Sequence, residues 1–271
     1  MYNCSGEDSN FMKEKTYYYT DEVNEDFAGV SRREIIVDEK FKYVNHNPIY
    51  VFFEIILHRI IITPVAFFVK WFHFHQHVIG KKKLRGYKGQ YILYGNHTQI
   101  PGDGFLPPTM TFWRKPFFVV SPANIAAKGT KTFIMMLGGI PTPTSLKGLR
   151  KFEEGLSNRI KHHHPIIVYP EAHIWPYYTK IRNFKSTSFK YPSKFEVPAF
   201  CFTNTYQKRK FGKKAKMTTY IDGPFYPNNE LSGKAREQEL RDRIYNTMVE
   251  RAKNSTYEYK YHYIKKESQD E

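Results

Sequence analysis

The sequence predicts an α/β domain with a largely parallel sheet flanked by helices. From residue 86 onward, short apolar runs alternate with longer amphipathic segments, which is the pattern of strand–helix–strand units. The chain of 271 residues is also long enough for one domain of roughly 200 residues with extensions. Both observations favour one folded domain over several small ones.

The expected elements follow one another along this domain. Apolar runs predict buried strands over residues 90–95, 116–121, 165–169, 197–202 and 217–221. Helices are expected over residues 122–137, 146–160 and 240–248. The middle helix has apolar residues at helical spacing, namely Leu146, Leu149, Phe152, Leu156 and Ile160.

The composition divides the chain into four parts. Residues 1–47 form a polar extension, expected to be poorly ordered or draped over the surface, with ten acidic and six basic side chains. Residues 48–79 are expected to form a membrane-associated helical segment. The domain itself is expected over residues 80–252, and residues 253–271 form a polar tail.

The stretch from Ile49 to Val69 is the most apolar part of the sequence. Its length suffices for a helix across a bilayer, which takes about 20 residues. Glu54, His58 and the adjacent Arg59 interrupt it, and Pro64 is expected to kink a helix. A kinked helix or short helical hairpin in one leaflet fits these interruptions better than a clean span. The alternative is an amphipathic helix of a soluble protein, buried or on its surface.

The net charge of +16 predicts an anionic partner. The run Lys81–Lys83 suits anionic headgroups on the cytoplasmic face of a membrane. The same charge would attract coenzyme A or an acidic carrier protein, whereas no signature of a nucleic-acid-binding module is present. The histidines at 73, 75 and 77 and at 162–164 lack accompanying carboxylates or cysteines, so we expect no metal site.

Two segments combine an apolar strand with polar residues at its end. In the first, the strand ending at Gly95 is followed by Asn96-His97 and, after a Pro-Gly turn, by Asp103. A histidine at the carboxyl end of such a strand can take a proton from a hydroxyl, and a nearby carboxylate can orient it. In the second, the strand ending at Tyr169 leads into Pro170 and Glu171.

In this order and separation, the two segments resemble the glycerophospholipid acyltransferase family, typified by 1-acylglycerol-3-phosphate acyltransferase. That family has Asn-His followed by Asp, and about 70 residues later an apolar strand ending in Phe-Pro-Glu-Gly-Thr-Arg. The matching blocks here are Asn96-His97 with Asp103, 137–141, 169–173 and 197–200, and the resemblance covers about residues 80–250.

The resemblance implies a glycerol-3-phosphate acyltransferase-like fold and direct acyl transfer. His97 would be the base and Asp103 its orienting partner. The donor would be acyl-CoA or acyl carrier protein, and the acceptor a lysophospholipid at the membrane. No cofactor, metal or covalent acyl-enzyme is implied.

The sequence departs from the family pattern in ways that leave the acceptor open. Five residues separate His97 from Asp103 instead of four, and the family's Gly-Thr-Arg is replaced by Ala172-His173-Ile174. The arginine of the middle block is also missing, and Lys147, Arg150 or Arg182 could replace it. The residues that we assign to acceptor binding are Asn96, Glu171, His173, Lys147 and Arg150. The alternative function is a non-catalytic binder of lipid or a partner at the membrane, built on the same fold.

Overall fold

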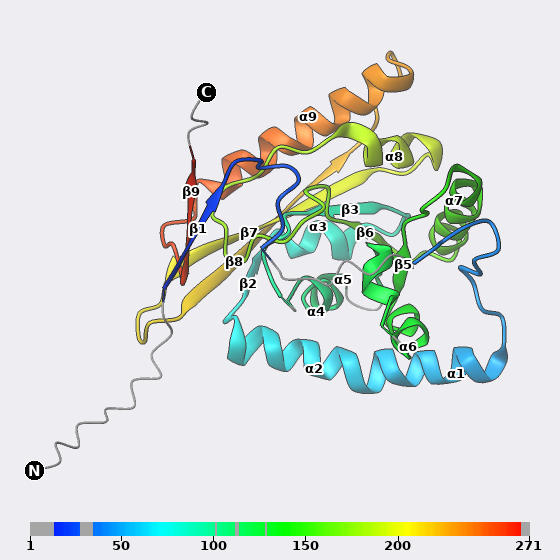
Figure 1. The fold of residues 1–271 in the computed structure, drawn as a ribbon, viewed down its shortest axis with the longest axis horizontal. Coiled ribbons are helices and arrows are strands. Elements are labelled where there is room, and N and C mark those ends of the chain that lie inside the picture. Colours follow the sequence, from blue (N-terminus) through cyan, green and yellow to red (C-terminus); the bar gives the residue numbers. More distant parts are fainter. Residues whose placement is uncertain (1–13, 28–34, 101, 112–113, 128, 267–271) are drawn as a thin grey trace, which may run out of the picture.

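The fold centres on a mixed seven-stranded sheet in a computed structural model that describes residues 14–27, 35–100, 102–111, 114–127 and 129–266 (Figure 1). In sheet order, the strands are β2 (His77–Ile79), β8 (Ala215–Phe225), β7 (Ala199–Lys208), β3 (Ile92–Gly95), β6 (Ile166–Val168), β4 (Phe117–Val120) and β5 (Gly139–Pro141). All neighbouring pairs in this sheet are parallel except β7 and β8. The predicted α/β class with a largely parallel sheet is confirmed.

Alternating residues of the central strands enter two different cores. On β3, Ile92 and Tyr94 face the larger core, whereas Leu93 faces the smaller one on the other side of the sheet. The larger core is covered by α7 (Leu146–Lys161) and α9 (Gly233–Ala252). The smaller core is covered by α3 (Lys81–Gly86) and α5 (Pro107–Thr111). The sheet is therefore the middle of three layers.

Short helices connect these elements. They are α4 (Gly102–Phe105), η3 (Pro122–Ile125), α6 (Thr130–Met136), η4 (Ser186–Phe189) and α8 (Lys190–Lys194). The expected helix over residues 122–137 is thus two helices, the 3-10 turn η3 and then α6. η3 ends at Ile125, and Gly129, with a positive φ of 84°, is the N-cap residue of α6.

The apolar segment forms one continuous helix from Pro48 to His73, 26 residues long and apolar enough to cross a membrane (Figure 1). Its parts are α1 (Pro48–Ile56), η1 (Leu57–Ile62), α2 (Thr63–Phe68) and η2 (Val69–His73), of which η1 and η2 are π-helical. Of the two expected forms, a kinked helix or a short helical hairpin, the hairpin is therefore wrong. Pro64 is accommodated because the turn before it widens, and the Thr63 amide and hydroxyl both donate to the carbonyl of His58.

This helix turns Glu54, His58 and Lys70 toward the domain and most of its large apolar residues outward. His58 and Lys70 are buried against the domain, and Glu54 pairs with Lys115 at 2.5 Å. The large apolar side chains exposed on it are Ile49, Phe52, Phe53, Ile55, Ile60, Ile61, Val65, Phe68, Trp71 and Phe72. Glu54 and His58, which interrupt the apolar stretch, thus help to attach it to the protein, whereas Arg59 is exposed.

The terminal segments take part in the fold more than their composition predicts. β1 (Lys15–Tyr19) pairs in parallel with β9 (Tyr261–Lys265), and both lie at one end of the main sheet (Figure 1). In the described part of the extension, Val37 and Tyr43 are buried in the larger core. The expectation that residues 1–47 are poorly ordered or surface-draped is wrong for these two residues.

Two glycines of α7 explain why this segment can pack so closely. A Cβ on Gly148 would lie 2.8 Å from the Val37 carbonyl, and one on Gly155 would lie 2.8 Å from the Tyr43 Cβ. The glycines are seven residues apart and therefore share one face of the helix. Because neither glycine has a side chain, Val37 and Tyr43 can approach this face of the helix closely.

Candidate active site

The site lies where β3 and β6 end, at the carboxyl edge of the parallel strands. β3 ends at Gly95, where a Cβ would meet the Phe202 ring at 2.1 Å, so only glycine fits. The Asn96 side chain then bonds to the main chain of Asn204 on β7, accepting at 2.8 Å and donating at 3.0 Å. These contacts fix the backbone on which His97 follows.

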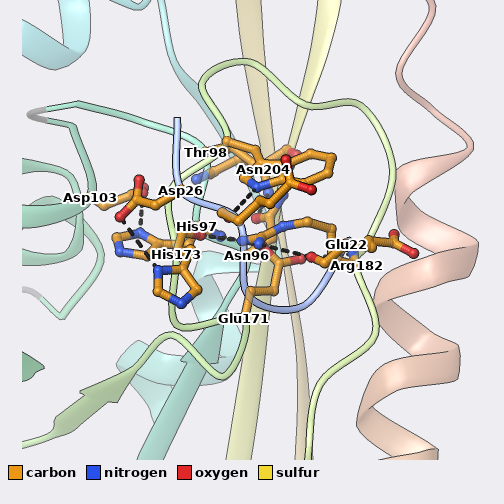
Figure 2. A network of polar contacts seen from close by, with 12 residues as sticks. Glu22, Asp26, Asn96, His97, Thr98, Asp103, Glu171, His173, Arg182 and Asn204 are labelled. Carbon is orange, nitrogen blue, oxygen red and sulfur yellow. Dashed lines mark hydrogen bonds and ion pairs between the residues drawn. The ribbon is translucent and has the colours of Figure 1, made fainter. Parts of the chain in front are cut away.

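His97 and Asp103 are in direct contact across a short turn (Figure 2). The His97 Nδ1 lies 2.7 Å from the Asp103 Oδ2, which also accepts the Gln99 amide at 2.9 Å. The side chain of His97 is 17% exposed and that of Asp103 only 4%, so the imidazole is the member that solvent can reach. Burial raises the pKa of Asp103, and this outweighs the lowering by the His97 contact.

The plane of the imidazole is also fixed. The His97 ring stacks on Tyr169 with ring centroids 4.4 Å apart and planes 15° apart. The Tyr169 hydroxyl in turn donates to the Asp103 carbonyl at 2.5 Å. Tyr169 follows β6, and its contacts with His97 and Asp103 therefore link the end of β6 to the turn that follows β3.

The longer spacing between His97 and Asp103 does not prevent their contact. The Asp103 amide donates to the Gln99 carbonyl at 3.2 Å, and Gly102 starts the short helix α4. This turn returns the chain so that the carboxylate meets the imidazole. Pro101, which we expected to take part in the turn, lies outside the described residues.

Glu171 is buried behind His97 and does not present its carboxylate at the surface. Its Oε2 accepts the His97 amide at 3.0 Å and lies 3.3 Å from Nη2 of Arg182, while Oε1 accepts the Arg182 amide at 3.1 Å. The residue as a whole is 3% exposed. This geometry gives Glu171 a positioning role, which differs from the predicted contact with the acceptor.

Arg182 is wholly buried, and both of its terminal nitrogens, Nη1 and Nη2, bond within the protein. Besides Glu171, its guanidinium bonds to the carbonyls of His173 and Glu22 and lies 4.9 Å from the centre of the Trp175 ring (Figure 2). A guanidinium in this position has no surface to offer a substrate phosphate. Of the cations considered as replacements for the missing arginines, Arg182 is thus structural.

Lys147 and Arg150 are not brought to the His97 cluster by any described contact. Both lie on exposed positions of α7, after β5 at the edge of the sheet. The Arg150 side chain is 88% exposed and pairs with Glu154 on the same helix. Among the described residues, no group of three or more histidine, cysteine or acidic side chains is arranged to hold a metal ion.

The N-terminal extension covers the Glu171 loop, which sequence reasoning did not anticipate. The Trp175 indole donates to the Glu25 carbonyl at 2.8 Å, and Asp26 lies 3.4 Å from the Nδ1 of His173 (Figure 2). About 150 residues separate these partners in sequence. No local pattern in the acidic segment indicates such contacts.

Tyr206 is a second unexpected residue of the site. Its hydroxyl lies 2.6 Å from the Thr98 hydroxyl and accepts the Gln99 side-chain amide at 2.7 Å. β7 carries Tyr206 beyond the end of β3, so that it lies beside the turn that follows His97. The apolar pattern of residues 197–202 marked only the first part of this strand.

The comparisons with known proteins agree with the architecture. The sequence matches no family model and no curated protein. Among solved structures, the chain is similar to the 1-acyl-sn-glycerophosphate (LPA) acyltransferase PlsC from Thermotoga maritima, with a TM-score of 0.52 and 18% sequence identity. The match covers 77% of this chain and 89% of that chain.

The chain has the fold of PlsC. The acyltransferase-like fold expected from the ordered blocks is therefore confirmed. The PlsC likeness concerns the architecture, and the chemistry depends on the residues described above.

Proposed function

We propose that the protein is an acyltransferase that moves a fatty acyl group from a thioester donor to a hydroxyl of a lysophospholipid-like acceptor. The observation that carries this proposal is the 2.7 Å contact between His97 Nδ1 and Asp103 Oδ2 at the end of β3. The contact occurs in a fold shared with an LPA acyltransferase. The acceptor would be 1-acylglycerol-3-phosphate or a related lipid, and the reaction would belong to phospholipid biosynthesis.

The geometry supports general-base catalysis by His97. Since Nδ1 is held by Asp103, Nε2 is left to take the proton of the acceptor hydroxyl. The hydroxyl oxygen attacks the thioester carbonyl to form a tetrahedral intermediate. The carbon–sulfur bond then breaks, and the imidazolium returns the proton to the departing thiolate. The Asp103 carboxylate stabilises the imidazolium between these steps.

The donor would be acyl-CoA or acyl carrier protein, since both supply an activated thioester. A thioester needs no further activation by a metal or a covalent acyl-enzyme. On the acceptor side, His173 is the accessible candidate of the Glu171 loop, with 34% of its side chain exposed. The buried contacts of Asn96, Glu171 and Arg182 keep the loops of the site in place.

The helix from Pro48 to His73 supports a membrane location. Its outward face exposes large apolar side chains, and its inward face is tied to the domain by Glu54 and His58. We propose that it lies along the cytoplasmic face of the membrane with its outward face in lipid. The nearby run Lys81–Lys83 would contact anionic headgroups.

The test is an acyl-transfer assay read by lipid mass spectrometry. Membranes containing the protein or its His97→Ala variant are incubated with acyl-CoA or acyl carrier protein and a panel of lysolipids. We expect acylated product to fall by about 10²–10⁴-fold in the variant, the usual contribution of a general base. His162→Ala, at an exposed position after α7, is the matched control and should keep activity. Equal product from the His97→Ala variant would contradict catalysis by His97, and no product from either protein would favour the non-catalytic binder.

A further inference from the structure

A cavity of about 300 Å³ lies beside the turn that follows His97. Ile100 lines its wall, and so does Tyr206, whose hydroxyl holds Thr98 and Gln99. Three residues span at most about 11 Å, so this wall is close to the His97 backbone. Neither Asp103 nor Glu171 takes part in this cavity, which is therefore separate from the acid–base pair.

The cavity has three cations and no acidic residue in its lining. Arg209 and Lys214 come from the β7–β8 hairpin, and Lys260 precedes β9. The Arg209 guanidinium is held in place by the carbonyls of Ala215 at 3.0 Å and His73 at 2.9 Å. Such a fixed cation, with two lysines near it, suits a ligand that carries several negative charges.

Tyrosine rings form the other part of the lining. Tyr177, Tyr259 and Tyr261 lie around the cavity, with the Tyr177 ring centre 4.9 Å from that of Tyr259 and 6.2 Å from that of Tyr261. Tyrosine faces stack favourably on nucleobases. A lysolipid headgroup supplies a phosphate but no flat ring, so it would leave these side chains unused.

We propose that this cavity binds the phosphoadenosine end of a coenzyme A thioester. The inference rests on the proposed function and selects coenzyme A over carrier protein as the donor. The purine would stack on the tyrosines, and the phosphates would meet Arg209, Lys214 and Lys260. The long pantetheine arm would then pass the turn at Ile100 and bring the thioester to His97.

The first experiment measures binding without turnover. Adenosine 3′,5′-bisphosphate is titrated into the full-length protein by calorimetry, next to glycerol 3-phosphate as the headgroup probe. We expect the bisphosphate to bind and Lys214→Asn/Lys260→Asn to weaken it about tenfold or more, with affinity falling as salt rises. Asparagine is chosen because Lys260 has a positive φ of 72°, which asparagine tolerates.

The matched control is Lys210→Asn/Lys216→Asn, on the same hairpin. Both lysines are exposed and neither lines the cavity, so the net charge changes equally in the two double variants. The control should change the dissociation constant less than twofold. An equal loss in both variants would show general attraction by the basic hairpin and would overturn the proposal.

Kinetics separate this inference from the proposed function. Acyl-pantetheine lacks the phosphoadenosine, so the ratio of kcat/KM for acyl-CoA to that for acyl-pantetheine measures the use of this cavity. The ratio should fall about tenfold in Lys214→Asn/Lys260→Asn and stay unchanged in the control variant. Tighter binding of glycerol 3-phosphate than of the bisphosphate, or no binding of the bisphosphate, would overturn the cavity assignment even if His97 is catalytic. Conversely, the His97→Ala variant should still bind the bisphosphate. The calorimetric titration therefore still tests the cavity assignment if the acyl-transfer assay fails.

Discussion

The network around His97 and the helix from Pro48 to His73 distribute polarity in opposite ways. Around His97, the polar residues Asn96, Asp103, Glu171 and Arg182 are almost inaccessible and bond to one another or to the main chain. On the helix, phenylalanines and isoleucines are exposed, while Glu54 and Lys70 face the protein.

The difference shows what each region needs from its surroundings. Buried polar groups are stabilised by hydrogen bonds, and most of those in the site have a partner within the protein. Asp103 Oδ1 and Arg182 Nε are buried without one among the described residues. Exposed apolar side chains are costly in water, at about 1.5–3 kcal/mol for each large one that could be buried. The helix therefore presents one apolar face outward, because its other face is attached to the domain.

The largest effect should come from Asp103→Asn, which removes charge from the site while keeping its shape. We expect acyl transfer to fall by about 10²–10⁴-fold because the imidazolium loses its counter-charge. Stability at pH 7 should not fall. Burial raises the pKa of Asp103 in the folded state, so its ionised form costs stability as pH rises through that pKa.

Parallel measurements of transfer rate and urea unfolding test this expectation. A loss of stability as large as the loss of activity would mean that Asp103 is part of the structural network. Asp103 would then belong with Glu171 and Arg182, whose mutual contacts hold the loop behind His97.

Arg182→Met should break the structural network. It leaves the Glu171 carboxylate buried without its partner, which costs about 3–5 kcal/mol. Arg150→Met, at a side chain that is 88% exposed, should cost less than about 0.5 kcal/mol. Urea unfolding of both variants and of Arg182→Met/Glu171→Gln checks this. The double variant no longer buries an unpaired carboxylate, so it should recover part of the lost free energy of unfolding. No recovery would mean that the guanidinium acts mainly through its other contacts.

The exposed face of the helix is tested by Phe68→Glu and Ile60→Glu. Each should weaken binding to anionic vesicles by about tenfold or more, because an apolar side chain in lipid is replaced by a charge. Thermal unfolding should be unchanged because both side chains are exposed. Phe211→Glu is the matched control, since Phe211 is 80% exposed on the β7–β8 hairpin. Binding is measured by co-flotation with vesicles. If Phe68→Glu and Ile60→Glu float with the vesicles as well as Phe211→Glu does, the exposed face of the helix does not contact lipid.

The smallest effect concerns Asp222, which joins β8 to α3 and α9. Its carboxylate accepts from Lys83 at 2.9 Å and from Arg251 at 2.8 and 2.9 Å. Burial raises its pKa, but these contacts together lower it below the ordinary value. The stabilisation is therefore present above the unfolded pKa near 4 and is lost as pH falls through the folded pKa.

Asp222→Asn should cost about 1–2 kcal/mol at pH 7, since both partners are partly exposed. The difference from the original protein should shrink when urea unfolding is repeated at about pH 3. A difference that stays constant with pH would show that the carboxylate charge is not what stabilises this corner.

The sequence predicts the central strands well because their apolar runs are buried on both faces of the sheet. It also places His97 and Asp103 at one strand end, where the structure brings them together. It does not predict the partners that come from far along the chain, such as Asn204, Tyr206 and the segment at Glu25. Their positions depend on how strands and loops assemble in three dimensions, and no repeating pattern of residues in the local sequence indicates that assembly.

The helix shows a different limit of sequence reasoning. Pro64 predicts a kink or hairpin when only the ideal α-helix is considered. A π-helical turn before the proline keeps the helix continuous, and it depends on Thr63 donating twice to His58. Hydropathy alone also could not tell which face is turned to the domain.

The pairing of β1 with β9 has a consequence for biosynthesis. Lys15 is paired with Tyr261 and Tyr19 with Lys265, so strands from opposite ends of the chain form one small sheet. Tyr263 of β9 also stacks on Trp175 at 5.0 Å, in the loop that carries Glu171. During synthesis, β1 is made about 240 residues before its partner strand. The cover over the Glu171 loop can therefore be completed only after residue 265 has left the ribosome, and nascent chains stalled before residue 261 lack it.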